Sequence, residues 1–225
     1  MYRPAVRDTP SLPIVYFLHG LPGGASDVFD AGAQDILDRL FGDGAPPFVL
    51  VAPDGNGVNH DDTEWADAKD GSDQLETWVT TTVQNAVEGD NLRPRDRRAI
   101  IGFSMGGYGA MNIALRHPDL YGQVVSIAGY FRVDDPDGMF GGDPDTEAAN
   151  TPLDHLDAAR GIRIALFDAT GEDIDLVRGQ AQTLHDELAQ RGVTSTIRLT
   201  AGEHSWSYAA SVLGDAFAFI ADGYR

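Results

Sequence analysis

Short runs of apolar and β-branched residues recur along the chain and alternate with longer segments in which apolar residues return every three or four positions. Runs of the first kind are typical of buried strands, and segments of the second kind are typical of amphipathic helices. The predicted strands cover residues 12–18, 48–51, 99–101, 124–127, 162–167 and 196–199. The predicted helices lie near residues 28–41, 75–87, 108–116, 176–191 and 208–221. Strand alternating with helix predicts an α/β fold, with a mostly parallel central sheet and helices on both of its faces.

The segment from Tyr130 to Leu156 interrupts this alternation. It is rich in Asp, Gly and Pro, and a loop of this length inside a domain usually carries function. No linker rich in Pro, Gly or Ser divides the rest of the chain. We therefore expect a single domain over residues 1–225, with residues 130–156 as a candidate lid or substrate-binding insertion.

Charge and residue content narrow the classes of partner. The 225 residues include 35 acidic and 16 basic side chains, and the formal net charge is -19. This charge repels phosphate backbones and anionic lipids, so neither a nucleic acid nor a membrane surface is an expected partner, and the acidic residues are expected on solvated loops and faces. The absence of cysteine excludes disulfides, a thiol nucleophile and thiolate metal sites. No run of 18 apolar residues is present, so no membrane span is predicted.

The strongest chemical signal is the pentapeptide Gly102-Phe103-Ser104-Met105-Gly106, which fits G-x-S-x-G. It directly follows a predicted strand and directly precedes a helical segment. A serine on such a sharp turn adopts a strained backbone conformation that exposes its hydroxyl above the sheet, and only small neighbours fit beside the turn. This context favours Ser104 as a nucleophile over a capping serine in a glycine-rich turn.

A neutral serine hydroxyl needs a base to accept its proton. Of the six histidines, His204 lies between the last predicted strand and the last predicted helix, where a chain order of Ser, acid and His places the base. The other five lie at a helix end, within a helix, in polar loops and in the glycine-rich turn after the first strand. In that turn, we expect His19 to be structural.

The acid that orients the imidazole should follow the predicted strand 162–167. Four acidic residues lie there, namely Asp168, Glu172, Asp173 and Asp175. Asp168 is expected at the strand end, and Asp175 has the position of an N-cap for the next helix. Asp173 is therefore the preferred acid, and Asp175 stays open as the alternative.

The oxyanion that forms during acyl transfer needs backbone N–H donors. One donor is expected from the glycine-rich turn at residues 19–24, which follows the first strong strand. Leu21 can donate from this turn, whereas Pro22 has no N–H. The second donor of the oxyanion hole is expected from Met105.

Together these motifs resemble the esterase branch of the α/β-hydrolase superfamily, which includes S-formylglutathione hydrolases, bacterial feruloyl esterases and cell-envelope mycolyltransferases. The resemblance covers nearly the whole chain. Its segments are Tyr2-Arg3-Pro4 (V-Y-L-P), residues 15–21 (Y-L-L-H-G-x), Pro53-Asp54-Gly55 (P-D-G), Glu76-Thr77 (E-T), residues 102–107 (G-x-S-M-G-G) and residues 202–206 (G-x-H-x-W). Two segments depart from the family pattern: Glu64-Trp65 stands where the family has an Asp-Trp pair beside its active site, and Thr170-Gly171-Glu172-Asp173 exchanges the first two letters of its G-T-x-D acid loop.

This resemblance implies an α/β-hydrolase fold and the hydrolysis or transfer of an acyl group from an ester or thioester. Ser104 would carry the acyl group as an acyl-enzyme, His204 would act as the base, and Asp173 would orient the histidine. One alternative is an acyltransferase that passes the acyl group to a sugar or another alcohol. A second alternative is a non-catalytic member of the family that binds a glycan or a lipid.

The expected substrate is a small-molecule ester that carries no negative charge, because the surface is acidic. Trp65, Trp206 and the segment 130–156 are expected to form an apolar cleft for its acyl group, so Trp65 is a candidate substrate-binding residue. Neither a metal nor a cofactor is expected. The sequence contains no G-x-G-x-x-G or G-x-x-x-x-G-K-[ST] motif, and a calcium loop around residues 134–138 would put Val133 and Pro144 at ligand positions.

Relatives in this branch usually begin with one or two strands before the V-Y-L-P segment, whereas this chain begins inside that segment. Either the chain is truncated or its sheet is trimmed. A trimmed sheet would leave a strand edge exposed near residues 48–51, which a second subunit of a homo-oligomer could cover. We expect a cytoplasmic protein if the chain starts as given, and a secreted one if its true N-terminus is missing.

Overall fold

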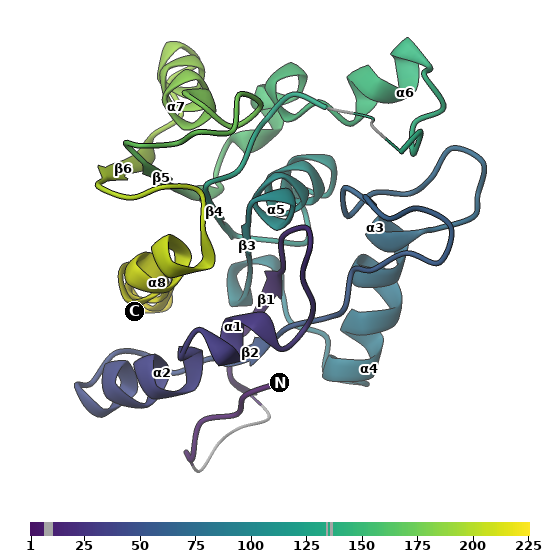
Figure 1. Ribbon diagram of the computed structural model, residues 1–225. Helices are drawn as coiled ribbons and strands as arrows, with labels where there is room; N and C mark the ends of the chain where they lie inside the picture. Colours follow the sequence, from purple (N-terminus) through teal and green to yellow (C-terminus); the bar gives the residue numbers. More distant parts are fainter. Residues whose placement is uncertain (7–10, 134, 136) are drawn as a thin grey trace.

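The sheet at the centre of the molecule contains all six predicted strands, which pair in parallel in the order β2-β1-β3-β4-β5-β6 (Figure 1). The computed structural model describes residues 1–6, 11–133, 135 and 137–225. The strands are β1 (Ile14–Leu18), β2 (Val49–Val51), β3 (Arg98–Phe103), β4 (Gln123–Ile127), β5 (Arg163–Ala169) and β6 (Ser195–Thr200). Their register pairs Leu18 with Gly102, and Gly102 with Ser126. The segments that follow β1, β3 and β4 therefore leave the sheet at the same edge.

The predicted helices appear in the predicted order with three differences, and a further short helix lies within the segment 130–156. They are α1 (Asp27–Asp30), α2 (Ala33–Gly42), α3 (Leu75–Thr77), α4 (Gln84–Glu88), α5 (Met105–Arg116), α6 (Pro144–Ala149), α7 (Gln180–Gln190) and α8 (Trp206–Asp222). Gly32, with a φ of 88°, divides the predicted helix over 28–41 into α1 and α2. The predicted helix over 75–87 contains a π-helical stretch at residues 78–83. The expected start of α7 near residue 176 is wrong, because Gly179 has a φ of 76° and the helix begins after it.

Apolar side chains alternate between the two faces of the sheet, as the pleat of each strand requires. One face packs against α5, α7 and the helical segment 75–88, and the other packs against α2 and α8. In Figure 1, α2 and α8 accordingly lie on one side of the strands, while α4 and α5 lie on the other. Because helices cover both faces, the residues that can reach a ligand lie on the loops beyond the strand ends.

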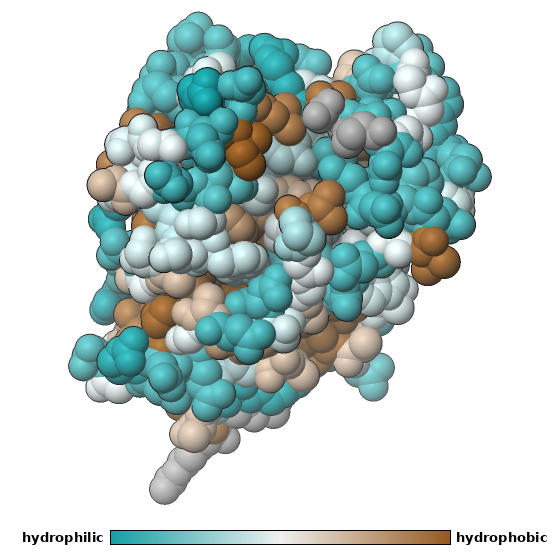
Figure 2. All heavy atoms as spheres, in the orientation of Figure 1, coloured by the Kyte–Doolittle hydropathy of each residue, from teal (hydrophilic) through white to brown (hydrophobic). Residues whose placement is uncertain are grey.

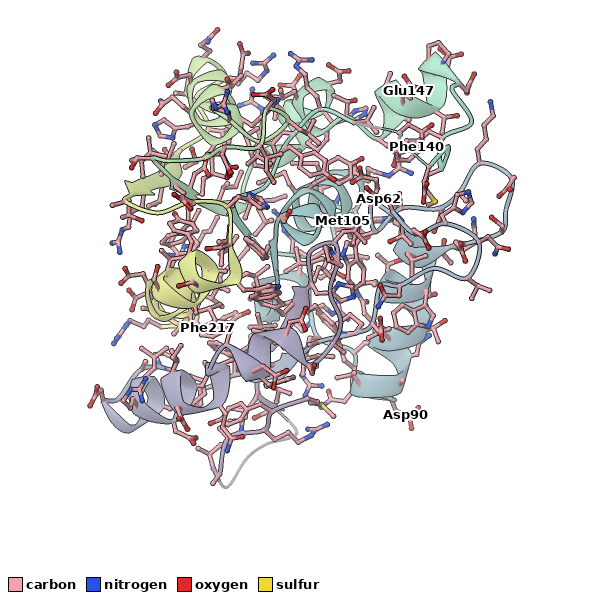
Figure 3. The ribbon with its side chains drawn as sticks, viewed as in Figure 1. Asp62, Asp90, Met105, Phe140, Glu147 and Phe217 are labelled. Carbon is pink, nitrogen blue, oxygen red and sulfur yellow. The ribbon has the colours of Figure 1, made fainter. Side chains whose placement is uncertain are left out.

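The segment 130–156 is folded against the loop at residues 57–73. It contains α6 and a short 3-10 helix at residues 152–154. Asp137 accepts hydrogen bonds from the amides of Asp61 and Asp62 at 2.7 and 2.9 Å, and Lys69 pairs with Asp143 at 3.0 Å. Two apolar residues of the segment, Met139 and Phe140, pack against two alanines of the loop, Ala66 and Ala68. Asp62 and Phe140 are labelled where these two segments meet in Figure 3.

Residues 134 and 136, which belong to the calcium-loop pattern considered above, lie outside the described residues. The described part of the segment 130–156 contacts the neighbouring loop through hydrogen bonds, an ion pair and apolar packing. A role of this segment as a lid or a substrate-binding insertion stays a prediction.

The outer strand β2 is less exposed than the sequence suggested. Tyr2 forms an antiparallel bridge with Leu50, and the side chains of Phe48, Val49 and Leu50 have no exposed surface. Phe41 packs edge-on against Phe48 at 5.1 Å between ring centroids. The N-terminal segment therefore pairs with part of the edge near residues 48–51, and nearby aromatic rings cover the side chains there. A second subunit at this edge stays a prediction. None of the described helices has both the length and the apolar character that a membrane span requires.

The glycines around the β3–α5 turn make a testable contribution to stability. A Cβ atom on Gly102 would lie 2.0 Å from the backbone oxygen of Gly106, so we expect Gly102→Ala to lower the free energy of unfolding by about 3 kcal/mol. Gly214 in α8 is the matched control, because the nearest atom to an added Cβ is 3.9 Å away. Gly214→Ala should raise stability by about 0.5–1 kcal/mol. Urea unfolding of both variants checks the prediction, and equal stabilities would contradict it.

Candidate active site

Ser104 occupies the sharp turn between β3 and α5. Its backbone has a φ of 56° and a ψ of −121°, a region that residues with a side chain rarely adopt. Its amide donates to the carbonyl of Ile127 at 2.9 Å, and its carbonyl accepts from the amide of Tyr108 at 3.0 Å. These bonds hold the turn from both sides. The partly exposed side chain of Ser104 therefore stands at the N-terminal end of α5, beside Met105, which Figure 3 labels near the middle of the molecule.

Three side chains form a continuous line of hydrogen bonds at the carboxyl edge of the sheet. Nε2 of His204 lies 2.8 Å from Oγ of Ser104, and Nδ1 of His204 lies 2.8 Å from Oε2 of Glu172. An ionised carboxylate can only accept, so Nδ1 carries the proton and Nε2 accepts from the serine hydroxyl. The side chains of His204 and Glu172 are 9% and 3% exposed. This arrangement can move a proton from the serine onto a held imidazole.

The acid beside His204 is Glu172, whereas the sequence favoured Asp173. Asp173 and Asp175 are both exposed, and Asp175 forms an ion pair with Arg178 at 2.7 Å. Asp175 is not an N-cap either, because α7 begins five residues later. The structure therefore places neither sequence candidate at the histidine.

The backbone of the acid loop explains this choice. The amide of Thr170 donates to the carbonyl of Thr200 at 2.8 Å, and the amide of Gly171 donates to the carbonyl of Gly202 at 3.0 Å. This pairing continues the contact of β5 with β6 and turns residue 172 inward. Oε1 of Glu172 then accepts from the amide of Ile174 at 2.9 Å. Glu172 was present among the four acidic residues considered, but only this non-local pairing distinguishes it from its neighbour.

Aromatic rings hold the histidine in place. The ring of Phe103 stacks on His204 with 5.2 Å between centroids, and Trp206 packs on the same phenylalanine at 4.8 Å. Oγ of Ser205 accepts from the amide of Tyr208 at 3.1 Å and caps the start of α8. His204 is thus held by ring stacking, and the two residues that follow it are held by a helix cap and by packing.

The glycine-rich turn after β1 lies directly against the serine. A Cβ atom on Gly20 would lie 3.1 Å from Cβ of Ser104, so the two backbones nearly touch. Leu21 follows in the same turn, and Met105 is the first residue of α5, where an amide has no acceptor within the helix. Both expected donors therefore belong to segments that border Ser104. Their role toward an oxyanion stays a prediction.

His19 has a structural environment. Its Nδ1 lies 2.9 Å from the carbonyl of Gly20, and its Nε2 accepts from the amide of Gly55 at 2.8 Å. The side chain is buried, so both nitrogens are used to join the turn after β1 to the turn after β2. This agrees with the structural role that the sequence suggested.

Trp65 has no exposed surface, which contradicts its expected role in substrate binding. Its indole Nε1 donates to the carbonyl of His19 at 2.9 Å. The ring fills space beside Gly55 and Gly109, where an added Cβ would lie 2.3 and 2.5 Å from its atoms. Trp65 therefore supports the turn after β1 from within the core.

Two buried groups on the loops beyond the strands were not singled out from the sequence. Tyr130, at the start of the segment 130–156, donates from its hydroxyl to the carboxylate of Glu64, and its ring stacks on Tyr108 at 4.9 Å. Asp73 accepts from the amides of Val58 and Asn59 at 3.0 and 2.8 Å. Burial by itself would raise the pKa of Asp73, but these hydrogen bonds outweigh it and hold the pKa well below its ordinary value. Periodicity gives no signal for either group, because each depends on contacts between distant loops.

Asp168, at the end of β5, is a second buried carboxyl close to the acid loop. It is 3% exposed and accepts from the amide of Ala169 at 2.9 Å. Burial raises the pKa of Asp168 to about 7, and the negative charge of Glu172 acts in the same direction. Asp168 therefore retains its proton to a higher pH than an exposed carboxyl does.

Comparison with known proteins finds a matching family model and related sequences. A family model described as "Putative esterase" matches residues 1–220. An uncharacterized protein of Corynebacterium glutamicum is 28% identical over 240 residues, which cover 97% of this chain and 55% of that protein. The MPT51/MPB51 antigen of Mycobacterium tuberculosis is 32% identical over 134 residues, which cover 55% of this chain and 42% of the antigen. This chain thus spans about half the length of the curated relatives it matches.

Solved structures share the fold at lower identity. A ferulic acid esterase has a TM-score of 0.81 at 22% identity, with 94% of this chain and 85% of that chain covered. An S-formylglutathione hydrolase from Agrobacterium tumefaciens has a TM-score of 0.78 at 20% identity, with 94% and 84% covered. MPT51 of Mycobacterium tuberculosis has a TM-score of 0.73 at 20% identity, with 95% and 90% covered. The expected α/β-hydrolase fold is confirmed.

The raised pKa of Asp168 predicts a pH-dependent stability. The unfolded carboxyl has a pKa near 3.8, so between pH 4 and pH 7 unfolding releases a proton that the folded protein retains, and the free energy of unfolding falls as the pH rises. Asp168→Asn removes this dependence. We expect its Tm to match that of the unsubstituted protein near pH 4 and to exceed it at pH 8. Thermal unfolding followed by circular dichroism at both pH values measures the difference.

Asp157→Asn is the control for this prediction, because the side chain of Asp157 is 86% exposed. It should change the Tm by a similar small amount at both pH values. An Asp168→Asn variant with the same Tm difference at pH 4 and pH 8 would show that the buried carboxyl does not titrate in this range.

Proposed function

Because the chain belongs to the esterase family whose model spans residues 1–220, we propose that it is a serine hydrolase that cleaves carboxylic esters through an acyl-enzyme on Ser104. The observation that carries this proposal is the unbroken line from Ser104 through His204 to Glu172, with both N···O separations at 2.8 Å. Thioesters fit the same chemistry. The similarity to a ferulic acid esterase and an S-formylglutathione hydrolase supports ester and thioester cleavage as the reaction class.

The first half of the reaction acylates the serine. Oγ of Ser104 attacks the carbonyl carbon of the ester while its proton passes to Nε2 of His204. A bond forms between Oγ and the carbon, and the carbonyl oxygen becomes an oxyanion. The carboxylate of Glu172 stabilises the imidazolium through the bond to Nδ1. The oxyanion then reforms the carbonyl, the bond to the alcohol oxygen breaks, and His204 returns the proton to that oxygen.

The second half releases the acid. A water molecule gives a proton to Nε2 of His204 and attacks the acyl carbon, and the bond to Oγ breaks as the serine regains a proton. The amides of Leu21 and Met105 are the proposed donors to the oxyanion in both halves, because both belong to segments that border Ser104. A side-chain substitution leaves these amides in place, so the oxyanion hole depends on the backbone of the turn and of α5.

An acyltransferase would use the same acyl-enzyme with an alcohol in place of water. A non-catalytic binding protein would have no use for a complete Ser-His-Glu line. Product analysis distinguishes a hydrolase from an acyltransferase when an ester is supplied together with a sugar acceptor. Free carboxylic acid identifies hydrolysis, and an acylated sugar identifies transfer.

The nucleophile is testable by substitution and labelling. The purified protein should hydrolyse p-nitrophenyl acetate and should be labelled at Ser104 by a fluorophosphonate. Ser104→Ala should abolish labelling and lower kcat by about 10⁵- to 10⁶-fold, as removal of a triad serine does in other hydrolases. Ser211→Ala, in the last helix, is the control and should keep both properties. Full activity in Ser104→Ala would exclude this nucleophile.

The identity of the acid is testable with a pair of neighbouring substitutions. Glu172→Gln keeps the size of the side chain but removes the charge that orients and stabilises the imidazolium, so kcat should fall by about 10³- to 10⁴-fold. Asp173→Asn, next in the chain and exposed, should leave kcat within about twofold. Steady-state kinetics on one ester measures both. A larger loss in Asp173→Asn would return the role to the residue that the sequence favoured.

A further inference from the structure

Two large apolar side chains are exposed on the loops that hold the proposed active site. Leu21, in the turn after β1, is 39% exposed, and Ile174, in the turn after β5, is 40% exposed. Single exposed apolar residues are common on protein surfaces. These two residues differ from the others because their backbone amides belong to the proposed catalytic machinery. The amide of Ile174 donates to the carboxylate of Glu172, and the amide of Leu21 is a proposed oxyanion donor.

The sheet order puts these side chains on opposite sides of Ser104. Leu21 follows β1, which adjoins β3 on one side, and Ile174 follows β5, which lies two strands away on the other side. With neighbouring strands about 4.8 Å apart, the two loops leave the sheet roughly 14 Å apart, with Ser104 between them. Figure 2 shows brown atoms of apolar residues at the surface in the middle of the view, separated by paler atoms. A bound ester could therefore contact both side chains.

The direction of proton transfer shows which part of the ester lies on which side of Ser104. His204 returns its proton to the alcohol oxygen, so the alcohol group of the ester must lie on the side of Ser104 that faces the imidazole. Glu172 is hydrogen-bonded to the far side of the imidazole, and the amide of Ile174 donates to Glu172. Ile174 therefore lies on this side of Ser104. The amide of Leu21, the proposed oxyanion donor, lies in the turn on the opposite side of Ser104. Because the alcohol group occupies the imidazole side, the acyl group extends away from it, toward the side on which Leu21 lies.

The alcohol side carries negative charge. The side chain of Asp175 is 92% exposed, and Glu203 beside the histidine is exposed as well. Arg178, the arginine of the acid loop, is paired with Asp175 and donates to the carbonyls of Glu172 and Asp173. An alcohol group with a carboxylate would approach these acidic side chains and be repelled.

We propose that Leu21 and Ile174 determine the specificity of the site for an uncharged, apolar ester, with Leu21 in contact with the acyl group and Ile174 in contact with the alcohol group. The inference rests on the proposed esterase function. Each methylene that a substrate buries on such a side chain improves binding by about fourfold, so a few methylenes suffice to set a preference.

Two substrate series separate the roles. The acyl series compares p-nitrophenyl hexanoate with p-nitrophenyl acetate, and the alcohol series compares hexyl acetate with methyl acetate. Leu21→Asn should lower the hexanoate-to-acetate ratio of kcat/KM by about five- to tenfold and leave the alcohol ratio within about twofold. Ile174→Asn should do the reverse. Leu92→Asn, in a loop at the other edge of the sheet and 56% exposed in its native form, is the control and should change neither ratio.

A pair of esters, one neutral and one with a carboxylate in its alcohol group, tests the effect of the acidic side chains near Ile174. Butyl acetate should be preferred over the acetyl ester of 4-hydroxybutyrate, in which a carboxylate replaces the terminal methyl group, by about tenfold in kcat/KM at low salt. This preference should shrink at high ionic strength, because salt screens charges on exposed side chains. Equal use of both esters at low salt would overturn the part of the inference that concerns charge.

The outcomes separate this inference from the proposed function. No hydrolysis of any ester and no fluorophosphonate label at Ser104 in the unsubstituted protein would overturn both. An active protein whose ratios stay unchanged in Leu21→Asn and Ile174→Asn overturns the specificity roles alone. Exchanged effects, with Ile174→Asn changing the acyl ratio, overturn the assignment of sides. Fluorophosphonate labelling of each variant verifies that its site is intact, so a misfolded variant is not counted as a result.

Discussion

The structure depends on the close approach of three backbone segments at the start of α5. A Cβ atom on Gly106 would lie 2.1 Å from the carbonyl oxygen of Leu18, and one on Gly102 would lie 2.0 Å from the carbonyl oxygen of Gly106. Only glycine fits at these positions, and the contact draws the first turn of the helix onto the ends of β1 and β3. Ser104, between the two glycines, adopts a positive φ of 56° in this turn.

The other parts of the site are placed relative to this turn by the parallel sheet. Parallel strands end at one edge, so the loops after β1, β3, β5 and β6 meet there although they are far apart in the chain. Gly20 comes from the first of these loops, Glu172 from the third and His204 from the last. Hydrogen bonds between residues 170–171 and 200–202 join the last two loops, and this joint fixes the distance between acid and histidine. The proposed chemistry therefore rests on backbone contacts more than on the side chains around it.

The acidic composition has two parts with different physical roles. Most carboxylates are exposed, as the sequence suggested, and these account for an acidic surface that disfavours anionic partners. A smaller group is buried within the fold, and besides Asp168, which accepts from the amide of the next residue, five of its members accept hydrogen bonds from more distant residues: Glu64, Asp73, Glu76, Glu88 and Glu172. Buried carboxylates persist only with donors at hand, so each of these marks a joint between segments. Composition alone cannot separate the two parts, because burial depends on the partner and not on the residue.

The sequence by itself determined the six strands, their parallel arrangement, the turn at Ser104 and the loop of His204. These follow from local properties, namely the period of apolar residues and the small size required beside a sharp turn. The tertiary structure alone decided that Glu172, and not Asp173, faces the histidine, and that Trp65 is buried beneath the turn it had been expected to border. Adjacent side chains point in different directions, and the direction at residue 172 is set by pairing with residues some thirty positions away. No local pattern carries that information, because it arises only when β5 and β6 lie side by side.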